Sequence, residues 1–219
     1  DEEAMHKFIA RHSDRLSARD RQRLDAAIAG RAREVNELAL HTHLLALIES
    51  RSMAERGNRH FDFERLAHMI VFFAERLRPS RTKLNKLLWY ADFLAFKRQS
   101  VSLSGTPYLR FQYGPVPEQY ERLVAEVVSE GLVTEVADDA TAESQQVGQR
   151  PAAHLETCIR FDASMFSAEE LAVLEAVRER FADLGAAQIR DISHEERAWR
   201  ETPEKQVIPY ALAADLSLA

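Results

Sequence analysis

Cysteine, glycine and long apolar runs are scarce in this 219-residue sequence. Its single cysteine, Cys158, cannot form an intramolecular disulfide or a multi-thiolate zinc site, so we expect a reducing, cytoplasmic location. Seven glycines and no GxGxxG or GxxxxGK[ST] motif argue against a glycine-rich phosphate-binding loop. Apolar runs such as 44–48 and 69–74 are much shorter than the roughly 20 residues that span a bilayer, so we expect no membrane segment. Because the chain begins with Asp1 rather than Met, we also expect a further N-terminal portion.

The charge of the chain is distributed unevenly. Hydrophobic residues make up 46% and charged residues 29%, as in globular proteins. The net charge of −6 divides into +1 for residues 1–60, +2 for 61–131 and −9 for 132–219. An acidic second half is more typical of a protein that binds other proteins than of a general nucleic-acid binder.

The first 60 residues are expected to form a helical N-terminal extension that ends in a linker. Glycine and proline are almost absent from 2–56, and Val35, Leu38, Leu45 and Ile48 have the spacing of a long amphipathic helix. The polar tract 56–60 then predicts a linker. We therefore divide the chain into this extension, 1–60, and a domain, 61–219.

Three helices are predicted at the start of the domain. Asp62 is a candidate N-cap for a helix that ends before Pro79. A second helix, from Ser80 to about Arg98, is expected to bury Leu84, Leu87, Leu88, Ala91, Leu94 and Ala95. Short extended pieces at 101–103 and 108–111 lead to a rigid turn at 113–117, and a third helix runs from about Pro117 to Gly131.

A two-stranded ribbon should follow the third helix. Strands are predicted at 132–136 and 155–161, joined by a polar, mobile loop at 137–153. Three helices followed by a ribbon are typical of a winged-helix-like unit, so the predicted class is mainly α (α+β) with a small antiparallel ribbon. Two helix starts are predicted beyond it by capping boxes, Ser167 with Glu170 and Ser193 with Glu196, and the second helix carries Trp199.

Five motifs of this sequence resemble the Panacea domain, the family that includes the SocA-like antitoxins and the phage-associated GepA proteins. They are KLNKLLWYADF (83–93), SGTPY (104–108), YGPVP (113–117), EGLV (130–133) and SHEERAW (193–199), and they occur in the expected order.

The resemblance implies a mostly helical antitoxin that neutralises a toxin protein by binding it, with no catalytic residues and no cofactor. One family member delivers its toxin to a protease, so a protease is a further expected partner, as is a second copy of the chain. A different hypothesis remains open. The protein would then be a transcriptional regulator that contacts DNA through residues 1–60 or through sequence preceding Asp1.

The expected partner-binding surface lies around the corner between the second and third helices. Prolines and glycines stiffen this backbone, and aromatic residues, which are common interface anchors, are concentrated there. The residues assigned to it are Gly105, Tyr108, Tyr113, Gly114, Pro115, Val116, Pro117 and Tyr120. The alternative for each ring is that it fills the core. Structural roles are expected for Trp89, Asp92, Ser193, Glu196 and Trp199.

The remaining polar patterns favour structural roles. No histidine has an acidic or thiol partner at a metal-ligand spacing, so no metal site is expected, and Cys158 is expected to be buried and inert. On the second helix Lys83, Lys86 and Lys97 share a face with Tyr90 and Phe93, whose rings we expect to pack under the third helix. That third helix is acidic, with Glu118, Glu121, Glu126 and Glu130, and should be repelled by DNA phosphates.

Overall fold

The computed structural model describes residues 30, 42–137 and 153–218. The chain divides into two compact units, Asp1–Ala46 and Leu47–Ala219, which are treated separately. In the first unit residues 42–46 are helical, and the amphipathic helix expected around Val35 and Leu38 lies outside the described residues. The second unit contains, in order, α3 (Phe63–Leu77), α4 (Arg81–Gln99), β1 (Tyr108–Phe111), β2 (Gly114–Pro117), α5 (Tyr120–Ser129), β3 (Val133–Ala137), β4 (Ala153–Thr157), η2 (Ala163–Met165), α6 (Ala168–Phe181), α7 (Ala186–Glu195), α8 (Arg197–Glu201) and η3 (Tyr210–Asp215).

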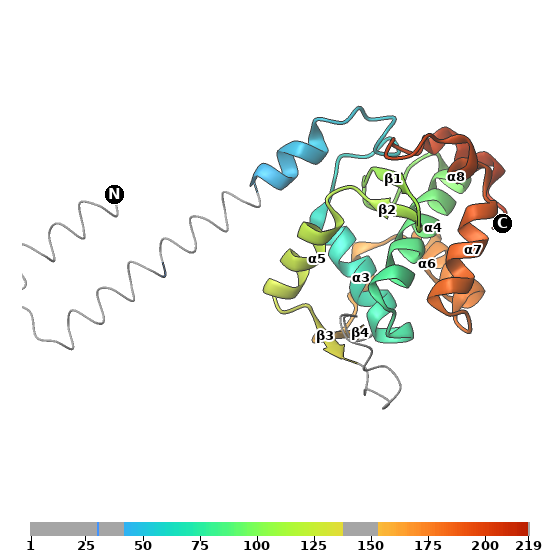
Figure 1. Cartoon of the computed structure of the whole chain (residues 1–219). Helices are drawn as coiled ribbons and strands as arrows, with labels where there is room; N and C mark the ends of the chain where they lie inside the picture. Colours follow the sequence, from blue (N-terminus) through green and yellow to red (C-terminus); the bar gives the residue numbers. More distant parts are fainter. Residues whose placement is uncertain (1–29, 31–41, 138–152, 219) are drawn as a thin grey trace, which may run out of the picture. The chain divides into compact units, whose positions relative to one another are not determined.

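Helix α4 is the central element of the second unit (Figure 1). All residues from Lys83 to Ala95 are buried, because α3, α6, α7, β2 and η3 pack around the helix. The predicted helix is therefore confirmed, and its buried stretch includes more residues than the apolar ones predicted. Among the described residues, no helix combines the length and apolarity needed to cross a membrane.

The predicted α+β class and the ribbon are confirmed. Strands β3 and β4 pair antiparallel, with Val133 opposite Thr157 and Ala137 opposite Ala153. Strand β4 ends at Thr157, earlier than predicted, because the chain beyond it turns so that Phe161 packs on Phe72, with ring centroids 5.1 Å apart. Most of the loop expected to be mobile, 137–153, lies outside the described residues.

The rigid turn predicted at 113–117 is instead a strand. Residues 114–117 form β2, which pairs antiparallel with β1, and α5 begins only at Tyr120. On its other side β1 bonds to 205–208: Arg110 N donates to Gln206 O at 3.0 Å and Ile208 N to Tyr108 O at 2.7 Å. Strand β2 is therefore at an edge, where its two prolines lose no ladder hydrogen bond.

The predicted linker 56–60 lies within the second unit and packs against the rest of it. Arg56 is only 4% exposed, and its carbonyl accepts a hydrogen bond from Ser102 Oγ at 2.9 Å. Gly57 O accepts from Ser102 N at 2.8 Å, and Arg59 Nε donates to Ser102 O at 2.6 Å. This tract is thus part of the compact unit that begins at Leu47.

The capping predictions had different outcomes. Asp62 accepts from Arg65 N at 3.0 Å and begins α3, as predicted. The Ser167–Glu170 capping box is also present. The Ser193–Glu196 box is wrong, because Ser193 lies inside α7 and donates to Arg190 O at 2.7 Å.

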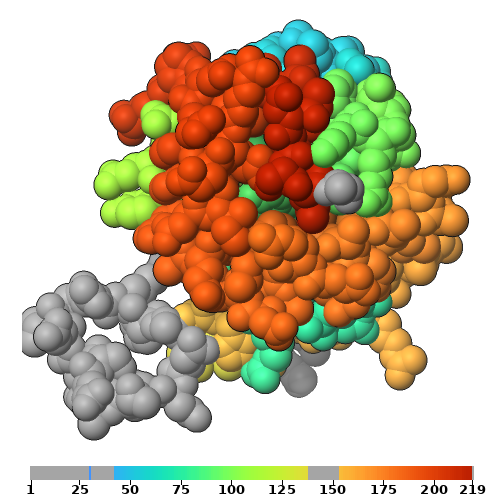
Figure 2. All heavy atoms as spheres, turned by 90° about the vertical axis from the view of Figure 1, so that its right-hand side faces the viewer, coloured from blue at the N-terminus to red at the C-terminus, as the bar shows by residue number. Residues whose placement is uncertain are grey.

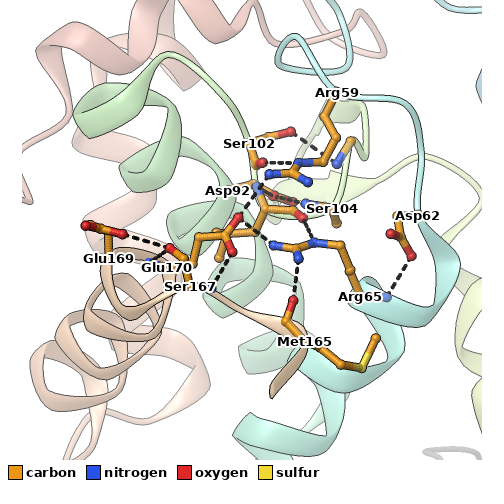
Figure 3. Close-up of polar contacts among 12 residues, drawn as sticks. Arg59, Asp62, Arg65, Asp92, Ser102, Ser104, Met165, Ser167, Glu169 and Glu170 are labelled. Carbon is orange, nitrogen blue, oxygen red and sulfur yellow. Dashed lines mark hydrogen bonds and ion pairs between the residues drawn. The ribbon is translucent and has the colours of Figure 1, made fainter. Parts of the chain in front are cut away.

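Glu170 also joins three parts of the chain (Figure 3). One of its oxygens accepts from Arg65 Nη2 at 2.6 Å and from Arg59 Nη2 at 2.9 Å, while the other accepts from Ser167 N at 2.9 Å. The side chain is only 9% exposed. The start of α6 is therefore fixed to α3 and to the 56–60 tract by charge-assisted hydrogen bonds.

We predict that Glu170→Gln destabilises the protein by about 2 kcal/mol at pH 7, because two arginines lose their anionic partner while the cap is retained. Burial works to raise the pKa of Glu170, but the hydrogen bonds from Arg65 and Ser167 hold it below its ordinary value of 4.5. A carboxyl group whose pKa is lowered on folding stabilises the folded state above its ordinary pKa of 4.5. The difference in unfolding free energy between wild type and Glu170→Gln should therefore decrease as the pH falls below 4.5. Urea unfolding at pH 7 and pH 4 measures both effects. Glu169→Gln, at the exposed neighbouring position, is the control and should change stability little.

Candidate protein-interaction site

The corner between α4 and β1 is organised by one buried carboxylate. Asp92 on α4 is 0% exposed. Its Oδ1 accepts from the backbone N–H groups of Leu103 at 2.7 Å and Ser104 at 2.8 Å, and its Oδ2 accepts from Ser104 Oγ and Tyr108 Oη, both at 2.6 Å. Figure 3 shows Asp92 beside Ser104. The carboxylate thus holds the loop that leads into β1.

The electrostatics of Asp92 balance burial against hydrogen bonding. Burial raises the pKa of Asp92, while the hydrogen bonds from Ser104, Tyr108 and Leu103 oppose that change. Burial next to this carboxylate also raises the pKa of Tyr108 well above its ordinary value. Tyr108 therefore stays neutral, and its hydroxyl group donates a hydrogen bond to Asp92.

Close backbone packing adds to the rigidity of this corner. Gly105 has φ +75°, and a Cβ at this position would lie 2.5 Å from His60 O. Tyr210 Oη donates to Thr106 O at 2.7 Å and connects the loop to η3. The corner is therefore bound to three separate parts of the chain.

The structure divides the residues assigned to partner binding into two groups. Tyr108 is 0% and Tyr120 6% exposed, and Tyr120 Oη donates to Arg81 O at 3.2 Å. These two rings support the corner from inside and cannot contact a partner in this conformation. Buried backbone positions complete the first group: Gly105, Gly114, Pro115 and Pro117.

Tyr113 is the exposed member of the set, with Val116 half-buried. Tyr113 lies in the turn between β1 and β2 and is 62% exposed, the most exposed large apolar side chain among the described residues. Among the residues assigned to partner binding, an exposed ring therefore occurs only at the tip of the β1–β2 hairpin.

Basic side chains lie under and beside this hairpin. Lys86 is 1% exposed, and a Cβ at Gly114 would come within 2.6 Å of its Cε and 2.9 Å of Ser193 Oγ. Strand β2 therefore rests directly on Lys86 and on α7. In Figure 2 α7 and α8 cover much of the face in view, and contacts between β2 and α7 place the hairpin beside them.

Aromatic stacking connects the hairpin to α8. The guanidinium of Arg110 lies 4.3 Å from the centre of the Trp199 ring, and the His194 ring stacks on Trp199 with centroids 3.9 Å apart. Trp199 Nε1 donates to Phe111 O at 3.2 Å. We name Lys86, Arg110, Arg190 and His194 the basic cluster.

The cluster lowers the pKa of its own members. Burial and the nearby Arg190 lower the pKa of Lys86 to about 8. Burial, Arg190 and Lys86 lower the pKa of His194, against an opposing effect of Asp191. Positive charge is therefore concentrated here, although the segment 132–219 is acidic as a whole.

Three other side chains of this region have partners that differ from those predicted. Tyr90 and Phe93 do not pack under α5. The ring centroids of Tyr90 and Phe181 on α6 are 4.6 Å apart, and the Phe93 ring stacks on Tyr210 with centroids 4.4 Å apart. Glu196 accepts from Tyr90 Oη at 3.2 Å and Ser217 N at 3.0 Å instead of capping a helix with Ser193.

The expected structural residues Trp89 and Trp199 also have defined places. Trp89 is 0% exposed and packs on Tyr90 and Phe93, while Trp199 belongs to the stack described above. Cys158, expected to be buried, is exposed. No group of three or more His, Cys, Asp or Glu side chains suited to a metal ion occurs within 42–137 and 153–218.

Comparison with known families identifies the chain. The family described as "Antitoxin SocA-like, Panacea domain" matches residues 84–200, just over half of the sequence. The chain belongs to the SocA-like antitoxin family. The match begins on α4 and ends in α8, so this Panacea domain includes Asp92, the hairpin and the basic cluster. No curated protein and no solved structure matches the chain.

Tyr108→Phe should destabilise the Panacea domain by about 2 kcal/mol, because Asp92 loses a charge-assisted hydrogen bond. Tyr113→Phe makes the same chemical change at the exposed position and should leave the free energy of unfolding within about 0.5 kcal/mol of wild type. Denaturant unfolding of both variants tests this. Equal stabilities would show that Asp92 does not depend on Tyr108.

Lys86→Met should make the protein more stable than wild type at pH 7, by about 3 kcal/mol for a pKa that falls from 10.5 to about 8. The folded state disfavours charged Lys86, so this cost is complete below pH 8 and is relieved as the pH rises toward 10.5. The advantage of the variant should therefore decrease between pH 8 and pH 10. Lys205→Met, at an exposed position, is the control. If the stability difference between Lys86→Met and wild type stays constant from pH 8 to pH 10, the pKa of Lys86 is not lowered by folding.

Proposed function

We propose that this protein is an antitoxin that neutralises a cognate toxin by direct binding, and that the β1–β2 hairpin tip with the adjacent α7–α8 face forms the contact surface. Family membership supports the antitoxin role. The observation that carries the location is Tyr113, an exposed ring at the tip of a hairpin whose base is fixed by Asp92.

A rigid hairpin suits this role. Strand β1 is bonded on one side to β2 and on the other to 205–208, and Trp199 holds Phe111 O at the last residue of β1. A surface that is already ordered loses little conformational entropy when it binds. Tyrosine offers a large contact area with few rotatable bonds, which explains its frequency among binding hot spots. Neutralisation is then stoichiometric: one bound antitoxin domain covers or distorts one toxin active site.

Helix α5 does not favour a DNA-reading role for the domain. Glu121 is exposed on the helix and Glu130 is exposed directly after it, while Glu118 just before the helix binds Arg51 at 2.6 Å. Glu121 pairs with Arg81. A helix that places carboxylates at its surface would meet the phosphate backbone with like charge.

The test is binding of the full chain to the protein encoded by the neighbouring gene, measured by calorimetry, with rescue of growth when both are expressed. We expect a stoichiometric complex with the wild-type chain. Tyr113→Ala should weaken it at least about 30-fold, which corresponds to roughly 2 kcal/mol, while stability is unchanged.

Ile159→Ala is the matched control, because Ile159 is also an exposed apolar residue, at 36%, but follows β4 rather than lying in the hairpin. It should bind as wild type does. If Tyr113→Ala binds with wild-type affinity, the hairpin tip is not the contact surface.

A further inference from the structure

The basic cluster brings together four cationic or protonatable side chains from three elements. Lys86 comes from α4, Arg110 from β1, and Arg190 and His194 from α7. Within the described part of the chain, the acid that pairs with a member is Asp191, an exposed residue whose Oδ1 lies 2.7 Å from Arg190 Nη2. Several arginines elsewhere on this domain have acidic partners, for example Arg51 with Glu118 and Arg65 with Glu170. The cluster therefore has more positive charge than its own fold neutralises.

Two buried nitrogen atoms of the cluster, Arg110 Nε and His194 Nε2, lack a hydrogen-bond partner within the described residues. Lys86 is only 1% exposed and lies close enough to His194 to lower its pKa. The large majority of buried side-chain polar atoms in proteins have a hydrogen-bond partner. Two exceptions in one cluster point to an acceptor supplied from outside the chain.

The side chains around these nitrogens are packed against one another and partly exposed. Trp199 is held between Arg110 and His194 and is bonded to Phe111 O. Arg110, Arg190, His194 and Trp199 are each half-buried, whereas Lys86 lies beneath Gly114. An incoming group would therefore meet guanidinium and imidazole groups first, with the ammonium of Lys86 below them.

We propose that the basic cluster is the docking site for a carboxylate side chain, Asp or Glu, on the surface of the bound toxin. The inference rests on the proposed function, since Tyr113 at the hairpin tip is next in sequence to Gly114, which covers Lys86. A carboxylate offers two acceptor oxygens to the unpaired nitrogens of Arg110 and His194, next to the positive charge of Lys86 and Arg190. Arg110 Nε and His194 Nε2 are already buried in the free protein, so binding does not need to remove water from these two atoms.

A single carboxylate fits this site better than a nucleic acid. The exposed acids Asp191 and Glu195 flank the cluster on α7, and the segment 132–219 has a net charge of −9. A polyphosphate chain would meet these charges along its length, whereas one acidic side chain contacts only the local positive region.

Proton uptake should accompany this binding. Lys86 faces Arg190 and the β2 backbone, and His194 faces Arg190, Lys86, Arg110 and Asp191. A carboxylate among these groups favours the charged forms of Lys86 and His194. Affinity should therefore rise as the pH falls from 9 to 6, and calorimetry in buffers of different ionisation enthalpy should detect protons taken up.

The experiment measures binding of the neighbouring gene's toxin to four full-length chains: wild type, Lys86→Met, Arg110→Gln and Arg122→Gln. The first two variants should each weaken binding at least tenfold and reduce its dependence on salt and pH. Arg122 is an exposed arginine on α5, outside the cluster, so Arg122→Gln should change affinity less than twofold.

Lys86→Met separates a binding role from a structural one, because it should raise stability while it lowers affinity. A toxin variant with one surface acid changed to lysine should lose binding, and Arg110→Glu should restore part of it. If Lys86→Met and Arg110→Gln are folded and bind as wild type does, the cluster is not a docking site and the proposed function stands. If the wild-type chain does not bind the toxin, the proposed function fails and this inference fails with it.

Discussion

The buried carboxylate of Asp92 is the constraint on which the interaction surface depends. It lies on the central helix α4 and gathers four donors from Leu103, Ser104 and Tyr108. These contacts fix the loop from which β1 starts, and so they fix the direction in which the hairpin leaves the core. An uncompensated charge at this depth would cost several kcal/mol, so the loop and the helix can only be stable together.

The same helix supports both the fold and the proposed function. Both carboxylate oxygens of Asp92 accept two hydrogen bonds each. Lys86, nearly two turns earlier on α4, is buried without an acidic partner among the described residues. The buried positive charge of Lys86 beneath the hairpin therefore raises the free energy of the folded state. Functional sites commonly retain such costs, because a group that is fully satisfied within its own chain has little to gain from a ligand. A toxin carboxylate would relieve this cost, and specificity for an acidic partner follows from it.

Features that depend on neighbouring residues could be predicted from the sequence, whereas features that depend on contacts between distant residues could not. Asp62, and Ser167 with Glu170, act within one helical turn, and their caps are as predicted. The two prolines of β2 predicted a turn instead of a strand. A strand can hold them here because β1 pairs with 205–208 on its other side and leaves β2 at an edge, and this long-range pairing cannot be seen in the local sequence. Ser193 and Glu196 had capping spacing, but Glu196 binds Tyr90 and Ser217, which are far away in sequence. The sequence shows that aromatic residues are concentrated at this corner, but only three-dimensional packing shows that Tyr113 is exposed and Tyr108 is buried.

Hydrogen–deuterium exchange of the full chain, free and bound to the toxin of the neighbouring gene, tests the location of the interaction surface most directly. Backbone amides report protection without any substitution, so stability and binding are not confounded. We predict that binding slows exchange at 111–114 in the hairpin tip and at 190–199 in α7 and α8, with little change in α5. Protection confined to α5 or to residues 42–56, with none in the hairpin tip, would contradict it.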